Sequence, residues 1–277
     1  MDNLDTSAEN TWCPGCGNFG ILVAFKKAIE SLIAHGFPKQ EFVVVSGIGC
    51  NGKIADYLNL NSFLSLHGRP IASAQGIKIA NKKLKVIAFI GDGGCYNEGI
   101  SHLIHSAKRN TDITVLVHNN RRFALTVNQF TATSPKGFKG SSTPEGSIEE
   151  PLNPLKLAFS SNSTFIARGY SAKIEHLKNL IIKGIKHRGF SFIEILQPCI
   201  SFFNTYQYYN ERVYEMSDDF LDSKKMAQKK IEEWDCNETN GKIPIGVFYR
   251  VNKPIYEGSS NPKDKCIDFE AILKKHI

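Results

Sequence analysis

Short apolar runs rich in β-branched residues recur along this chain of 277 residues, and each run ends in glycine or in polar residues. Runs of this length and composition are typical of strands that are buried on both faces of a parallel sheet. Segments with helical spacing of apolar residues separate them. Because strands and helices alternate, we expect an α/β fold with a doubly wound, mainly parallel sheet. The expected strands are residues 42–45, 86–90, 113–117 and 192–196, and the expected helices are 18–36, 71–81, 98–109 and 174–187.

The segments that follow the expected strands carry most of the chemically informative residues. In a doubly wound sheet, ligands gather at the carboxyl ends of the strands. The four runs lead into residues 47–50, 91–94, 118–120 and 197–199, which supply glycines, cysteines, an aspartate and two asparagines. We therefore expect these four segments to form a single composite site.

Two oxygen donors follow neighbouring expected strands. Asp92 lies within Gly-Asp-Gly, and Asn120 ends the next run. Mg²⁺ prefers oxygen ligands in near-octahedral order and shares them with a phosphate group, so Asp92, the Asn120 amide and a nearby backbone carbonyl can supply the protein's share. Gly93 and Gly94 would let backbone N–H groups approach a diphosphate at the start of the next helix. Gly-Asp-Gly also occurs in ordinary turns, so the prediction depends on its pairing with the distant asparagine.

The composition indicates a globular protein, because 42% of the residues are hydrophobic and a chain of this length can bury a large core. The formal charge of +7 does not indicate a nucleic-acid partner, because the lysines are scattered rather than gathered in one block. The start, MDNLDTSAEN, lacks the pattern of a signal peptide, and no apolar run reaches the length of a membrane helix. We expect a cytoplasmic protein with neither a nucleic-acid nor a membrane partner.

Four of the seven cysteines have informative spacing or position. Cys13 and Cys16 form a C-x-x-C pair, and Cys50 and Cys199 each follow an expected strand. An odd number of cysteines without an export signal argues against a disulfide framework. Four thiolates can hold a [4Fe–4S] cluster, tetrahedral zinc accepts the same ligands, and free thiols are the third alternative. Incidental thiols are the better interpretation of the remaining three, Cys95, Cys236 and Cys266.

Two segments give weaker signals. Residues 129–154 are rich in Thr, Ser, Gly and Pro, which is typical of a long loop that orders against a ligand or a partner. Beyond Phe202 the chain is first aromatic and then charged, with a helical pattern over 218–234.

Several blocks of this sequence, taken together and in order, resemble one family. The blocks are WCPGCGNFG, SGIGCNGK, LHGRP, QGIKIAN, GDGG, HLIHSAKRNTDITVLVHNN, ALT and IPIGVFYR, and they extend from Trp12 to Arg250. The chain resembles the β subunit of the 2-oxoacid:ferredoxin oxidoreductases. Each block alone is weak evidence, but so many in register are not expected by chance.

The resemblance implies a fold of the thiamine-diphosphate-binding type, with thiamine diphosphate, Mg²⁺ and a [4Fe–4S] cluster. It implies a cofactor-binding α/β domain over 1–205, and a C-terminal extension over 206–277 that packs on this domain or on the partner subunit. The implied cluster ligands are Cys13, Cys16, Cys50 and Cys199; the implied Mg²⁺ ligands are Asp92, Asn120 and the Arg122 carbonyl; the implied cofactor contacts are Ile48, Gly49, Cys50, Asn51, Gly93, Gly94, Ala124 and Leu125.

The implied reaction is oxidative decarboxylation of a 2-oxoacid, with pyruvate or 2-oxoglutarate as first candidates, to an acyl-CoA and CO₂. Electrons would pass through the cluster to ferredoxin or flavodoxin. An α subunit would supply the glutamate that activates the cofactor, so this chain should be inactive alone and should form at least an αβ pair. Lys53 and His67 match positions near the reacting end, and Arg69 does so less clearly. Surface solvation or a structural hydrogen bond is the competing interpretation of these three.

Two departures from the family pattern affect the prediction. Many relatives have an acidic residue where this chain has Gly94, and many have Thr-Lys-Gly-Gln where it has residues 126–129, Thr-Val-Asn-Gln. Val127 thus replaces a lysine expected to help hold the substrate, so another 2-oxoacid is possible. Two other functions stay open: a subunit of a non-oxidative thiamine-diphosphate enzyme, and a scaffold or regulatory subunit with structural metal.

Overall fold

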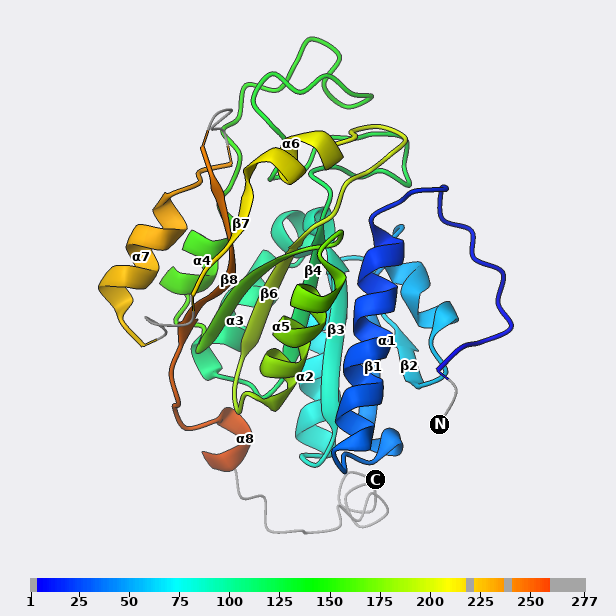
Figure 1. The fold of residues 1–277 in the computed structure, drawn as a ribbon, viewed down its shortest axis with the longest axis vertical. Helices are drawn as coiled ribbons and strands as arrows, with labels where there is room; N and C mark the ends of the chain where they lie inside the picture. Colours follow the sequence, from blue (N-terminus) through cyan, green and yellow to red (C-terminus); the bar gives the residue numbers. More distant parts are fainter. Residues whose placement is uncertain (1–3, 218–221, 237–240, 260–277) are drawn as a thin grey trace, which may run out of the picture.

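The computed structural model describes residues 4–217, 222–236 and 241–259. Within this part of the chain, eight strands form one sheet (Figure 1). The strands are β1 (Phe42–Ser46), β2 (Asn61–Leu64), β3 (Lys85–Gly91), β4 (Thr114–Asn119), β5 (Phe165–Tyr170), β6 (Ser191–Leu196), β7 (Val213–Glu215) and β8 (Ile243–Arg250). Their order across the sheet is β2-β1-β3-β4-β6-β5-β8-β7.

The sheet is parallel except where β8 meets β5, and that pair is antiparallel with a register shift between Ile166 and Ala167. This confirms the predicted α/β fold with a mainly parallel sheet. The four expected strands correspond to β1, β3, β4 and β6. Four strands were not expected from the sequence. They are β2, whose four residues are all exposed, β5, whose apolar pattern is interrupted by Arg168, and the two C-terminal strands β7 and β8.

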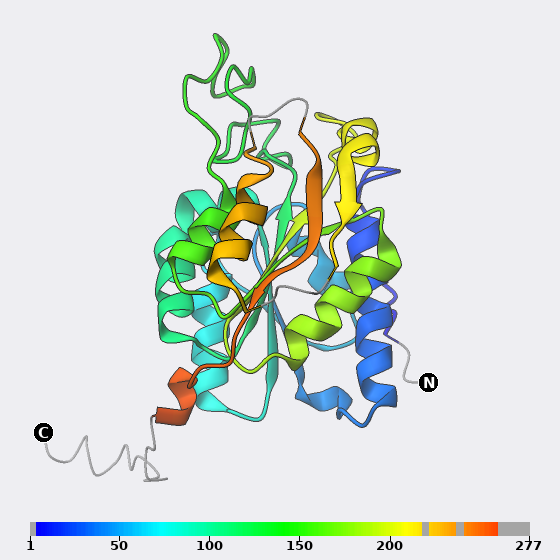
Figure 2. The same ribbon diagram turned by 60° about the vertical axis from the view of Figure 1, so that its left-hand side comes forward.

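Helices cover both faces of the sheet (Figures 1 and 2). The helices are α1 (Asn18–Ala34), α2 (Pro70–Ala80), α3 (Ile100–Arg109), α4 (Pro154–Ser160), α5 (Ile174–Lys186), α6 (Tyr206–Arg212), α7 (Lys224–Glu232) and α8 (Tyr256–Ser259). A π-helical turn, Gly94–Glu98, precedes α3, and short 3₁₀ helices span Lys39–Glu41 and Gly52–Tyr57. Part of the helix expected over 218–234 is α7; residues 218–221 lie outside the described residues.

Alternation along the strands divides the core into two layers, because successive side chains of a strand point to opposite faces. In β1, Val44 packs with α1 and α5, whereas Val43 and Val45 pack with α2 and α3 on the other face. Phe25 of α1 meets Phe89 of β3 edge to face, with ring centroids 4.9 Å apart. Helices therefore pack on both faces of the sheet, and the carboxyl ends of its parallel strands lie at the same edge.

The segment between β4 and α4 rises above the carboxyl ends of the strands as a long loop (Figure 1). It includes the loop expected over 129–154. Beyond residue 205, β7 and β8 continue the same sheet, and the proposed boundary at 205 stays a prediction. Among the described residues, no helix is long and apolar enough to cross a membrane.

Candidate active site

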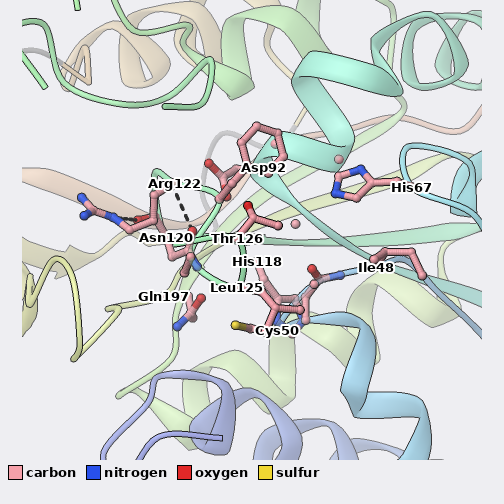
Figure 3. Close-up of a pocket in the computed structure, with 17 residues that line it drawn as sticks. Ile48, Cys50, His67, Asp92, His118, Asn120, Arg122, Leu125, Thr126 and Gln197 are labelled. Atoms are coloured by element: carbon pink, nitrogen blue, oxygen red, sulfur yellow. Dashed lines mark hydrogen bonds between the residues drawn. The ribbon is translucent and has the colours of Figure 1, made fainter. Parts of the chain in front are cut away.

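A pocket of about 500 Å³ lies at the carboxyl ends of β1, β3, β4 and β6 (Figure 3). The four segments expected to share a site all contribute to it, together with the loop after β4. Its lining comprises Ile48, Gly49, Cys50, Asn51, His67, Gly91, Asp92, Gly93, Gly94, His118, Asn120, Arg122, Phe123, Ala124, Leu125, Thr126 and Gln197. We call this cavity the cofactor pocket.

Asp92 follows β3 and is only 2% exposed. Its Oδ2 accepts hydrogen bonds from the hydroxyls of Thr131 at 2.7 Å and Thr133 at 2.8 Å, both from the long loop. Burial raises the pKa of the Asp92 carboxyl to about 6, and the two hydroxyls oppose that rise. A nearby cation would favour the ionised form, as a metal ligand requires.

Asn120 and Arg122 form a tight turn after β4. The Asn120 Oδ1 accepts a hydrogen bond from the Arg122 backbone N–H at 3.1 Å, and Arg121 between them has a φ of 63°. The Arg122 side chain donates to the Asn128 Oδ1 at 2.7 Å and stacks 4.1 Å from the Phe203 ring centroid. Burial lowers the pKa of its guanidinium to about 10, so it stays charged at neutral pH.

Two glycines of the pocket, Gly91 and Gly93, have no room for a side chain. A Cβ on Gly93 would come within 2.7 Å of three carbons of the Phe123 ring, and a Cβ on Gly91 would lie 2.8 Å from the Asn51 Oδ1. Gly49 has a φ of 108°, which side chains rarely tolerate. The bare backbone is thus exposed to whatever the pocket binds, as a diphosphate cradle requires.

Three residues that line this pocket have a buried polar atom without a hydrogen-bond partner within the described structure. These atoms are the Asn51 Nδ2, the His118 Nε2 and the Arg122 Nη2. The other ring nitrogen of His118 lies 2.8 Å from the Asn18 Oδ1, and burial lowers its pKa to about 3, so the imidazole is neutral. Buried polar groups are normally satisfied, so these atoms indicate a polar ligand. A phosphate-bearing cofactor with a metal ion fits this donor set.

A second cavity, of about 680 Å³, lies beside the first and contains the four cysteines. We call it the cysteine cleft. The C-x-x-C turn is closed by the Cys16 N–H, which donates to the Cys13 carbonyl at 2.9 Å, and the Trp12 indole donates to the Cys50 carbonyl at 2.7 Å. Its lining comprises Thr11, Trp12, Cys13, Cys16, Cys50, Lys53, Asn120, Ala124, Leu125, Val127, Gln197, Cys199, Ile200, Ser201 and Phe202.

The thiols of the cleft raise one another's pKa values. The pKa of Cys16 is raised to about 11, mainly by burial and to a smaller extent by the neighbouring cysteines, while a backbone hydrogen bond from Asn18 opposes the rise. The pKa of Cys50 is also raised, mainly by burial and then by Cys199, against the positive charge of Lys53. Thiolates crowded in this way need a cation for stability. Within the described chain, no three Cys, His, Asp or Glu residues are close enough together to hold a single metal ion.

The predicted catalytic residues lie in different cavities. His67 lines the cofactor pocket, where its Nδ1 is 3.1 Å from the Glu98 Oε2. Lys53 lines the cysteine cleft and donates to the Thr11 hydroxyl at 2.9 Å. Arg69 donates to the His102 Nε2 at 2.6 Å. Their roles stay predictions, although the position of Lys53 favours an effect on the thiols.

The remaining three cysteines and Val127 were also singled out from the sequence. Cys95 and Cys236 are buried, and Cys266 lies outside the described residues. Val127 is 66% exposed and has a φ of 67°, a value that β-branched residues rarely adopt. Its side chain lines the cysteine cleft.

Four further residues belong to the site: His118 and Gln197 line its cavities, and Thr131 and Thr133 donate hydrogen bonds to Asp92. His118 and Gln197 were expected at strand ends without a role, and Thr131 and Thr133 were not expected in the site. Gln197 lines both cavities, and its amide lies 3.5 Å from the Cys16 Sγ. The strand-end rule was the available signal for His118 and Gln197. The threonines had none, because they lie in a loop without periodicity.

The fold places this chain among the thiamine pyrophosphate enzymes. Residues 47–195 match the family described as thiamine pyrophosphate enzyme, C-terminal TPP binding domain. Residues 199–264 match the family described as the C terminal of the pyruvate ferredoxin oxidoreductase beta subunit.

Relatives that align over most of the chain identify one family within the thiamine pyrophosphate enzymes. The β subunit of 2-oxoacid:ferredoxin oxidoreductase 1 from Aeropyrum pernix is 41% identical over 268 residues, covering 91% of this chain and 81% of the relative. The corresponding subunit from Saccharolobus solfataricus is 43% identical and covers 87% and 82%. The 2-oxoglutarate synthase subunit KorB from Methanocaldococcus jannaschii is 36% identical and covers 88% of each chain. The chain therefore belongs to the β subunits of the 2-oxoacid:ferredoxin oxidoreductases.

A solved structure supports this assignment. A chain of the 2-oxoglutarate:ferredoxin oxidoreductase from Magnetococcus marinus, solved with 2-oxoglutarate, coenzyme A and succinyl-CoA bound, superposes with a TM-score of 0.87 at 28% identity, covering 100% of this chain and 91% of that one. The predicted family, fold type and enzyme class are confirmed. The protein is a subunit of an oxidoreductase that acts together with an α subunit.

Proposed function

We propose that this chain, in complex with its α subunit, catalyses the coenzyme-A-dependent oxidative decarboxylation of a 2-oxoacid and passes the electrons through a [4Fe–4S] cluster. One observation carries the proposal: the cofactor pocket and the cysteine cleft adjoin. Both cavities are lined by Cys50, Asn120, Ala124, Leu125 and Gln197. A site for decarboxylation and a site for electron transfer thus share one wall.

The cofactor pocket suits thiamine diphosphate with Mg²⁺. Bound there, thiamine diphosphate supplies the electron sink that allows a 2-oxoacid to lose CO₂. Asp92, Asn120 and the Arg122 carbonyl would hold Mg²⁺, and the backbone at Gly49, Gly93 and Gly94 would hold the diphosphate. The residues nearest the rest of the cofactor would be Ile48, Cys50, Asn51, Ala124 and Leu125.

The cysteine cleft suits a cluster better than a single ion. Zinc with four thiolate ligands, at Zn–S bonds of about 2.3 Å, would hold the sulfurs about 3.8 Å apart. A [4Fe–4S] cluster takes one thiolate on each of four iron atoms, so its ligands are spread further, and when bound it carries single electrons. Cys13, Cys16, Cys50 and Cys199 line one cleft, yet among the described residues no three potential ligands are close enough together for a single ion, which supports the larger group. The amide of Gln197 is placed to donate to a sulfur.

The balance of the reaction requires both cavities. A 2-oxoacid and coenzyme A give an acyl-CoA, CO₂, two electrons and one proton. Ferredoxin or flavodoxin is the proposed acceptor of these electrons. His67, on the rim of the cofactor pocket, can donate a hydrogen bond to the substrate carboxylate. Pyruvate and 2-oxoglutarate are the first substrates to test, and Val127, in place of a lysine, makes 2-oxoacids with apolar side chains the next.

The α subunit would cover the open side of the cofactor pocket. Ile48 and Leu125 line that pocket and are among the exposed large apolar residues. Phe63 and Leu64 of the edge strand β2, with Leu66 after it, add to this apolar surface. Exposed apolar patches of this kind mark partner surfaces.

Anaerobic purification of the complex tests the proposal. We expect about four iron and four sulfide for the cluster of this chain, and reduction of ferredoxin that depends on both a 2-oxoacid and coenzyme A. Zinc in place of iron would contradict the electron-transfer step. CO₂ release without electron transfer would indicate a non-oxidative enzyme. Bound cofactors without turnover of any 2-oxoacid would indicate a scaffold.

A further inference from the structure

A charged pair is completely buried behind the cofactor pocket. Arg168 of β5 donates through its Nε to the Glu194 Oε2 of β6 at 2.7 Å, and both side chains are 0% exposed. The guanidinium lies 4.7 Å from the Trp234 ring centroid and 5.6 Å from that of Phe248. Its two terminal nitrogens have no hydrogen-bond partner within the described structure.

Such a pair contributes little to stability. Desolvating two charges offsets most of their attraction, and apolar residues of similar volume often stabilise a core as well or better. Arg168 forms one hydrogen bond where a guanidinium can form five. A role in orienting other groups explains the pair better than stability does.

The group that the pair orients is Asn119, the last residue of β4. Its Nδ2 donates to the other carboxylate oxygen of Glu194, Oε1, at 2.7 Å. A carboxylate accepts on both oxygens and donates on neither, so Arg168 on one side and Asn119 on the other both find an acceptor. The Asn119 amide therefore has one orientation, with its nitrogen toward Glu194 and its oxygen toward the Arg121 N–H and the Thr133 hydroxyl.

The Asn119 oxygen contacts both groups that carry the predicted Mg²⁺ ligands: the turn with Asn120 and Arg122, and Asp92 through Thr133. It accepts the Arg121 backbone N–H at 3.1 Å, within the turn that carries the Asn120 amide and the Arg122 carbonyl. It also lies 3.0 Å from the Thr133 hydroxyl, which is 2.8 Å from the Asp92 Oδ2. Thr133 has a single proton for these two acceptors, so its hydroxyl is held between Asn119 and Asp92.

We propose that Glu194 and Arg168, acting through Asn119 and Thr133, are positioning residues for the metal ligands. Asp92 receives its hydroxyl bonds on Oδ2, and the network thereby leaves Oδ1 for the metal ion. This inference rests on the proposed Mg²⁺ and thiamine diphosphate site and deepens it. The buried pair connects that site to Trp234 and to Phe248 of β8, in the C-terminal part of the chain.

The test measures metal binding rather than turnover. The complex with the α subunit is freed of metal, saturated with thiamine diphosphate and titrated with Mn²⁺, and free Mn²⁺ is followed by electron paramagnetic resonance. Changing partners that orient metal ligands typically lowers metal affinity about 10–100-fold. We expect a loss of that size for Thr133→Val, which removes only the hydroxyl, and for Glu194→Gln, whose amide can accept on one side only. Thr133→Ser keeps the hydroxyl and should bind like the wild type.

The double variant Arg168→Met/Glu194→Leu separates positioning from stability. An apolar pair should keep or raise the melting temperature, yet it leaves the Asn119 amide free to turn, so we expect weak Mn²⁺ binding in a folded protein. Glu175→Gln, at an exposed glutamate of α5, is the control and should change neither quantity.

Wild-type Mn²⁺ affinity in Thr133→Val and in the folded double variant would overturn the inference. If Glu194→Gln does not fold, Thr133→Val and the double variant decide between the outcomes. If the wild-type complex itself binds no Mn²⁺ with thiamine diphosphate, the proposed function fails, and this inference fails with it.

Discussion

Gly93 offers the sharpest test of the cofactor pocket. In Gly93→Ala the new methyl group would come within 2.7 Å of three carbons of the Phe123 ring. Relief requires the ring to swing into the pocket that it lines or the Gly93 backbone to move. Overpacking of this kind costs about 1–3 kcal/mol. Because 1.4 kcal/mol is tenfold, the affinity for thiamine diphosphate should fall about 5–150-fold if the strain is carried by the bound state.

The assay is calorimetric titration of the complex with thiamine diphosphate in the presence of Mg²⁺, together with thermal unfolding of the cofactor-free protein. Gly76→Ala is the matched control, because a Cβ there meets nothing within 4 Å. Gly76 lies within α2, where alanine is favoured by about 0.5–1 kcal/mol, so this variant should bind normally and be slightly more stable.

A second substitution tests the cause. Gly93→Ala/Phe123→Leu removes the ring with which the new methyl group collides, so it should recover most of the lost affinity. Normal binding by Gly93→Ala would refute the reasoning, because the pocket would then tolerate a side chain at this position. A failure of Phe123→Leu to restore binding would also refute it, since the loss would then arise elsewhere.

Three further predictions follow from the two cavities. Asp92 has a pKa of about 6 in the folded protein against an ordinary 3.8, so the folded form binds more protons between these values. The metal-free protein should therefore lose up to about 3 kcal/mol of stability as pH rises from about 4 to about 6. Its affinity for Mg²⁺ should rise over the same pH range. In Asp92→Asn, both the stability measured by denaturant titration and the Mg²⁺ affinity measured by binding titration should become independent of pH in this range. Cys199→Ser should abolish the cluster's iron while thiamine diphosphate still binds, and retention of all the iron would exclude Cys199 as a ligand. Leu66, which is 77% exposed, should lie against the α subunit, so Leu66→Asp should weaken association in analytical ultracentrifugation while isolated chains keep their melting temperature; unchanged association would remove Leu66 from the interface.

Sequence patterns predicted the centre of the sheet well and its edges poorly. β1, β3, β4 and β6 are each buried over nearly their whole length, so their apolar runs were unmistakable. β5 is equally buried but includes Arg168, whose charge is accommodated only because Glu194 lies opposite it on β6. That pairing is a property of the folded sheet, and a single strand read alone cannot reveal it.

In the site, too, some residues could be predicted from the sequence and others could not. Asp92 and Asn120 were predictable, because a general rule places the carboxyl ends of parallel strands together. Thr131 and Thr133 were not, since they reach Asp92 across 39 and 41 positions of sequence from an irregular loop. Lys53 matched a family position, and only the three-dimensional structure places it among the thiols.

The wall between the cofactor pocket and the cysteine cleft limits how this subunit can diversify. A substitution at Cys50 or Gln197 alters the shape of one cavity and the surroundings of the thiols in the other. With the proposed cluster in the cleft, substrate range and the reduction potential of that cluster could not evolve independently at such positions. Independent adaptation is left to residues that line one cavity only, such as His67 and Phe123 on one side and Val127 on the other. Members of this family with new substrates should therefore differ first at those outlying positions.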